Sequence, residues 1–150
     1  MKFINILSAF LTPIIGLTTI SILVLQYLLQ RYRVRKDLYE PRIKIYRAVN
    51  EFLMHANQHD NVSEDTLTAL IQSTTEARFL FRGKIRKHIY LLHSKGLKLQ
   101  IINKRLDNPH LERGGERDKL VDALEEHSNW FSIQVEKTNK LFSKYLTLDE

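Results

Sequence analysis

The stretch FINILSAFLTPIIGLTTISILVLQYLLQ, residues 3–30, carries no charged side chain, and the basic segment RYRVRK follows it directly. As a helix these 28 residues would extend about 42 Å, which exceeds the hydrocarbon core of a bilayer at about 30 Å. A cleaved signal peptide has a shorter apolar region of about 7–15 residues, followed by small residues at the cleavage site. The stretch therefore predicts a transmembrane anchor over residues 1–30.

The charges that flank this anchor predict its orientation. Lys2 precedes it, and four cations follow it within a basic juxtamembrane segment, residues 31–40. Because Lys and Arg accumulate on the cytoplasmic side of single spans, we expect the N-terminus outside and residues 41–150 in the cytoplasm. The juxtamembrane cations are also expected to bind lipid headgroups or another anionic partner; they are Arg31, Arg33, Arg35 and Lys36.

Polar and small residues form a stripe along the predicted span. Those spaced by seven lie near one face of a helix, and a small-xxx-small series widens that face. The predicted self-association residues are Asn5, Ser8, Thr12, Gly16, Thr19 and Gln26. Two alternatives remain open: the hydroxyls bond back to carbonyls one turn earlier, or the stripe lines a water-filled path between copies.

Apolar residues recur at helical spacing through the rest of the chain, whereas strand-like alternation does not occur. We expect helices from Pro41 to about 56, then over about 64–80, 84–106 and 116–146, with Gly83 as an interruption. Ser63 or Asp65 would cap the second of these helices. The sequence thus predicts an all-α protein, with a cytoplasmic antiparallel bundle of about four helices after the span.

The strongest polar signal lies in residues 78–106, which hold nine Lys or Arg and no acidic residue. Three interpretations compete: pairing with the acidic last helix through Asp118, Asp122, Glu125 and Glu126, contact with anionic lipid, and contact with nucleic acid, which no base-stacking platform or reading motif favours. The candidate residues for an anionic partner are Arg82, Lys84, Arg86 and Lys87.

Signatures of catalysis are missing from the sequence. It has no cysteine, no phosphate-binding glycine loop and no recognisable nucleophile motif. His55 and His59, four residues apart and next to Asp60, are weak candidates for a metal site. We therefore expect a protein that is not an enzyme and has neither a cofactor nor a small-molecule substrate.

Three segments carry a family resemblance: LYEPRIKIYRAVNEFL at residue 38, EARFLFRGKIRKHI at residue 76 and WFSIQVEKTNKLFSKYLTL at residue 130. Together they resemble a widespread group of small, mostly uncharacterised bacterial proteins with one N-terminal span and a cytoplasmic helical domain. The resemblance implies the bacterial inner membrane and brings no catalytic residue. Some small membrane proteins of this kind act as effectors or accessories in phage defence.

Two functions follow as expectations. In the first, the helical domain of a self-associating anchored protein binds a cytoplasmic protein partner or acts as a membrane effector. In the second, the chain is a passive scaffold that recruits a cytoplasmic complex; a nucleic-acid binder with a basic face is a further alternative.

Overall fold

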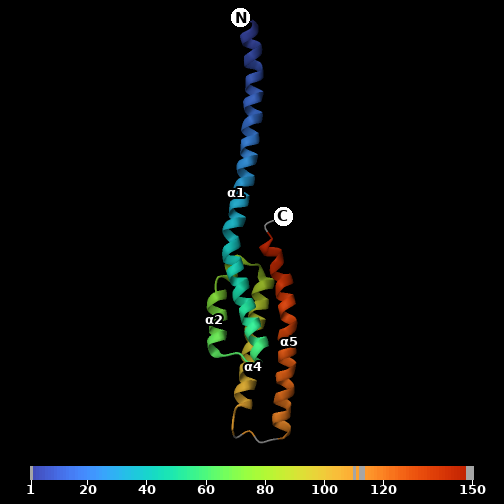
Figure 1. Cartoon of the computed structure of the whole chain (residues 1–150). Coiled ribbons are helices and arrows are strands. Elements are labelled where there is room, and N and C mark those ends of the chain that lie inside the picture. Colours follow the sequence, from blue (N-terminus) through green and yellow to red (C-terminus); the bar gives the residue numbers. More distant parts are fainter. Residues whose placement is uncertain (1, 110, 112–113, 148–150) are drawn as a thin grey trace. The chain divides into compact units, whose positions relative to one another are not determined.

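The computed structural model describes the backbone of residues 2–109, 111 and 114–147, and the side chains of these residues apart from those of 2–10 and 12. Within this part of the chain every regular element is a helix (Figure 1). The all-α prediction is confirmed over these residues. The helices are α1 (Lys2–His59), α2 (Glu64–Thr74), α3 (Ala77–Leu80), α4 (Gly83–Leu106) and α5 (Gly115–Leu146).

The chain divides into two compact units, Met1–Leu38 and Tyr39–Glu150. In the first unit the large apolar side chains of α1 are exposed, from Leu11 at 54% to Leu29 at 58%. By length and composition, α1 is the one helix in the described residues that could cross a membrane, and its most apolar stretch is not buried at all.

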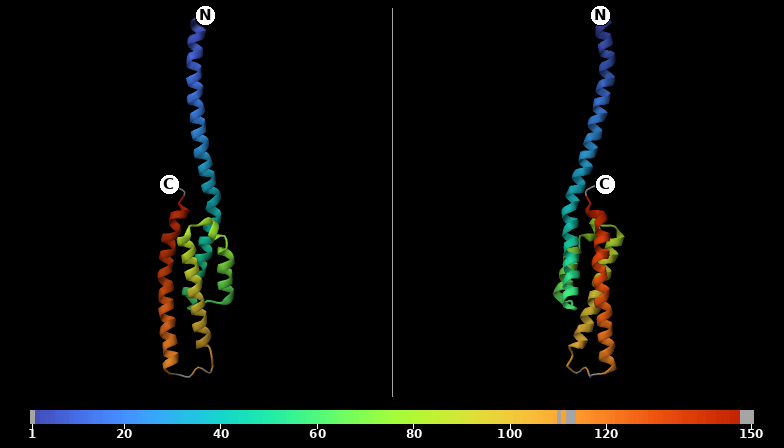
Figure 2. Two further views of the ribbon diagram at one scale, coloured as in Figure 1. Left: turned by 180° about the vertical axis from the view of Figure 1, so that it is seen from behind. Right: turned by 45° about the vertical axis from the view of Figure 1, so that its right-hand side comes forward.

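The second unit encloses the hydrophobic core. Its helices α4 and α5 lie side by side and run in opposite directions (Figure 2). The later part of α1 contributes a helical face, since Val49, Phe52 and Leu53 are almost fully buried. Aromatic side chains connect the helices: the Phe52 ring meets Phe131 edge-on at 6.0 Å between centroids.

Pro41 does not begin a helix, contrary to the expectation from sequence, because it lies inside α1. A proline within a helix removes one hydrogen bond, here to the carbonyl of Asp37. Asp37 is exposed, so water can hydrate that carbonyl. The predicted juxtamembrane segment, residues 31–40, is accordingly helical as well.

One continuous helix was predicted over residues 64–80, but the structure has two helices there. The predicted continuity was therefore wrong. The break falls at Thr75 and Glu76, between α2 and α3. The Oγ1 atoms of Thr74 and Thr75 donate to the carbonyls of Leu70 and Ile71, at 2.6 and 2.9 Å. Such bonds compete with the helical ladder and bend helices.

Other local predictions are confirmed. Ser63 caps α2, since its side chain accepts a hydrogen bond from the Thr66 amide at 3.1 Å. Gly83 is the first residue of α4, one position before the predicted start. Ile71 is 50% exposed, because Leu67, Leu70 and Thr74 form the buried face of α2.

Candidate functional site

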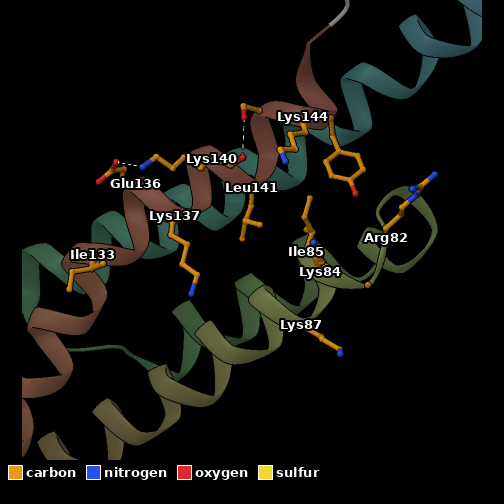
Figure 3. Close-up of a pocket in the computed structure, with 13 residues that line it drawn as sticks. Arg82, Lys84, Ile85, Lys87, Ile133, Glu136, Lys137, Lys140, Leu141 and Lys144 are labelled. Atoms are coloured by element: carbon orange, nitrogen blue, oxygen red, sulfur yellow. Dashed lines mark hydrogen bonds and ion pairs between the residues drawn. The ribbon is translucent and has the colours of Figure 1, made fainter. Parts of the chain in front are cut away.

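A groove of about 1160 Å³ runs between the first turns of α4 and the last turns of α5 (Figure 3). The antiparallel arrangement of these helices brings the two segments together although about fifty residues separate them in sequence. The groove wall includes the apolar residues Ile85, Ile133 and Leu141. Six cations also line it: Arg82, Lys84, Lys87, Lys137, Lys140 and Lys144.

The charge of this groove is almost uncompensated by acidic side chains. Its lining includes one carboxylate, Glu136. The Lys140 Nζ lies 2.6 Å from Glu136 Oε1, within α5, and both side chains are 75% exposed. The hydrogen bond from Lys140 lowers the pKa of Glu136 below its ordinary value. Among the described residues this is the one ion pair within 4 Å, so the other five cations of the groove form no such pair.

The acidic residues of α5 do not neutralise α4. Asp118, Asp122, Glu125 and Glu126 are exposed in the first half of α5. Because α4 and α5 are antiparallel, this half lies beside the end of α4, away from Arg82 and Lys84. No ion pair within 4 Å joins the two helices in the part of the chain that the structure describes. Pairing of the basic segment with these acids is therefore not observed there.

The predicted anion-binding residues separate into three places. Arg82, Lys84 and Lys87 line the groove. Arg86 lines a different hollow, beside Ile89 and Tyr90. The juxtamembrane cations Arg31, Arg33, Arg35 and Lys36 belong to the first unit.

The lysines of α5 are not among the binding residues predicted from the sequence, because the last helix was interpreted there as acidic. Lys137, Lys140 and Lys144 recur at intervals of three and four, and this spacing predicts one helical face. The signal was therefore present, but its meaning depends on which part of α4 lies opposite.

A buried polar contact adjoins the groove. His88, 4% exposed, and Thr138, fully buried, meet between α4 and α5 with Nε2 2.8 Å from Oγ1. Burial, together with the smaller effect of the nearby charge of Lys137, lowers the pKa of His88 from 6.5 to about 4. The imidazole is thus neutral at neutral pH, held by a hydrogen bond.

The two metal candidates lie together, and among the described residues no third ligand completes a site. The ring centroids of His55 and His59 are 4.7 Å apart. The described residues contain no group of three or more His, Cys, Asp or Glu side chains that could hold a metal ion.

The predicted self-association stripe is partly described. The side chains of Asn5, Ser8 and Thr12 lie outside the described residues. Thr19 Oγ1 donates to the Ile15 carbonyl at 2.7 Å, as the back-bonding alternative expected. Thr18 and Ser21 form similar bonds. Gly16 has no heavy atom within 4 Å of the position of an added Cβ, and Gln26 is exposed.

Comparison of the chain with protein-family models, curated proteins and solved structures finds no match.

Proposed function

We propose that the chain is a single-pass membrane protein without catalytic activity, which self-associates and uses its second unit to bind an anionic partner on the cytoplasmic side. The observation that supports anchoring is the exposure of the apolar side chains of α1 described between Leu11 and Leu29, where those such as Ile14, Leu17 and Leu25 have no cover within the unit. Contact of such an apolar surface with water is unfavourable in free energy, whereas contact with lipid is not. The bacterial inner membrane and the outward N-terminus belong to this proposal.

The binding role is supported by the groove between α4 and α5. Five unpaired cations in one hollow repel one another, and an anion placed among them would relieve that repulsion. The same charges suit the phosphates of a nucleic acid, which makes nucleic-acid binding the second candidate function. Binding of an anionic partner, as proposed, requires no catalysed reaction.

Anchoring and orientation are tested by cysteine labelling, since the chain has no native cysteine. Ser143 is exposed in the second unit. In intact bacterial cells, an impermeant maleimide should fail to label the Ser143→Cys variant and should label it after permeabilisation. A Lys2→Cys variant is the matched control and should be labelled in intact cells.

The outcomes separate the parts of this proposal. Labelling of Ser143→Cys in intact cells would show the reverse orientation. Release of the chain from membranes by alkaline carbonate would contradict the span itself, because a transmembrane helix resists that extraction.

A further inference from the structure

A second hollow, of about 520 Å³, adjoins the groove and shares Arg82, Lys144 and Tyr145 with it. It is also lined by Arg42 and Phe79. The Arg42 Nε donates to the Leu80 carbonyl at 3.3 Å, and its guanidinium carbon lies 5.8 Å from the centroid of the Tyr145 ring. The early part of α1 in this unit, the region of α3, the start of α4 and the end of α5 thus meet at one end of the second unit.

This is the end at which the chain enters the unit, because Arg42 follows Tyr39 by less than one helical turn. Residues 31–38 are the whole connection between the uncharged stretch and the second unit. Eight residues reach at most about 28 Å even when fully extended. If the stretch spans a bilayer, this end of the unit is held within reach of the headgroups.

Phe79 adds an apolar element to the same end. Its side chain is 76% exposed, among the most exposed large apolar side chains described in this unit. The Arg78 guanidinium carbon lies 4.7 Å from the centroid of its ring. An exposed aromatic ring among cations is suited to the headgroup level of a bilayer, where the ring meets the acyl boundary and the cations meet phosphate.

We infer that this end of the second unit is a docking surface for anionic phospholipids of the bilayer that holds the anchor. The docking surface consists of Phe79, Arg42 and the six cations of the groove. The cations bind lipid phosphates, and Phe79 enters the interface. The inference rests on the proposed anchoring and names the partner of the groove. Charge complementarity and the short connection favour lipid over a soluble anion.

The test uses the full chain in lipid nanodiscs, made of phosphatidylcholine alone or with a third of the lipid replaced by phosphatidylglycerol. A fluorophore on Thr75→Cys, an exposed position four residues before Phe79, reports proximity to lipids that carry a quencher on the headgroup. We expect stronger quenching in the anionic discs. The difference should vanish in about 1 M NaCl, where the Debye length is about 3 Å.

Variants test whether this quenching depends on the residues of the docking surface. Each cation near an anionic surface contributes about fivefold to binding. Replacing Arg82, Lys140 and Lys144 by Gln should therefore lower the ratio of docked to undocked units by about a hundredfold. The control replaces three exposed cations near the other end of α4, Lys98, Lys104 and Arg105, by Gln and should retain the quenching. Phe79→Ser should weaken it, whereas Tyr90→Ser, at an equally exposed ring on α4, should not.

Each alternative outcome contradicts a defined part of the inference. A chain that fails to enter discs would refute the anchoring, and the docking with it. Entry with equal quenching in both discs, or equal loss in the two triple variants, would refute the docking alone. If a labelled single-stranded oligonucleotide binds chains in phosphatidylcholine discs and the groove variant abolishes that binding, the groove is a nucleic-acid site and the lipid assignment is wrong.

Discussion

Gly96 shows how one residue determines helix packing in the second unit. It is buried in α4, and a Cβ added there would lie 2.9 Å from both Leu67 Cδ2 and Phe52 Cζ. Contacts that short require movement of a neighbour. The Phe52 ring is 3% exposed and packs against Phe131, so it has little room to move.

We expect Gly96→Ala to destabilise the protein by about 1 kcal/mol. Overpacking a core costs about 1–3 kcal/mol, which exceeds the gain of about 1 kcal/mol that alanine brings to a helix interior. Chemical unfolding in detergent, followed by circular dichroism, measures the change. Gly115→Ala is the control and should be at least as stable as the native chain, since nothing lies within 4 Å of its added Cβ. A fully stable Gly96→Ala would show that the helices separate at little cost.

His88 gives the second unit a pH dependence whose sign follows from its burial. Its pKa is about 4 when folded and 6.5 as the reference value, so the unfolded chain binds more protons between these pH values. The contribution of His88 to stability is therefore complete above pH 6.5 and is lost as the pH falls towards 4. A shift of this size corresponds to about 3 kcal/mol.

The His88→Gln variant should not lose stability in this way as the pH falls, because glutamine does not bind a proton. The glutamine amide can still reach Thr138. We expect the free energy of unfolding of the native chain, relative to this variant, to fall by about 3 kcal/mol between pH 7 and pH 4. His93→Gln, at a half-buried position on the same helix, is the control and should keep the slope that His88 produces. A constant difference between the native chain and His88→Gln across this range would contradict a neutral buried imidazole.

At the scale of the element, the polar residues in the first part of α1 differ in how many hydrogen bonds they can still form with another copy of the chain. The hydroxyl of Thr19 has one proton and donates it to the Ile15 carbonyl. Across an interface between copies it can therefore only accept. The amide of Gln26 makes no hydrogen bond among the described residues, so it has both donors free for a neighbouring copy.

We predict that Gln26→Leu weakens self-association in membranes more than Thr19→Val does. A hydrogen bond between transmembrane helices is worth about 0.6 kcal/mol, which corresponds to about a threefold change in dimer dissociation per bond lost. Gly16→Ile should weaken association by blocking close approach, because the helix itself leaves that position open. Cysteine crosslinking between copies measures both effects.

The control for this prediction lies on the same helix. Thr18 and Ser21 also donate to carbonyls one turn earlier, so replacing both by Leu should leave crosslinking unchanged. If Gln26→Leu and Gly16→Ile crosslink as the native chain does, the stripe consists of hydroxyls that satisfy their own helix.

At the scale of the whole molecule, charge is distributed unevenly. The chain carries a net charge of +6, yet the charge is uneven along α5: five of its six acids lie in the first half, and the three groove lysines lie in the second. The cationic half faces the start of α4, at the end where the chain enters the unit. A protein held at an anionic surface by that end would keep its acidic end away from the lipid, which reduces electrostatic repulsion.

The sequence alone determined the features that depend on local physics. Residues 3–30 lack charge, helical spacing recurs through the rest, and Ser63 precedes a helix that it caps. These depend on propensity, hydrogen bonding and periodicity within a few turns. Local physics also gave the wrong result at Pro41 and at Thr75, where a helix continued through a proline and ended without a glycine or proline.

The tertiary structure decided which distant residues meet. The groove exists because α4 and α5 run antiparallel in a register that places Arg82 and Lys84 opposite Lys140 and Lys144. That register depends on side chains that meet between α4 and α5, including the contact of His88 with Thr138. Contacts of this kind involve residues tens of positions apart, and no periodicity along one helix specifies them.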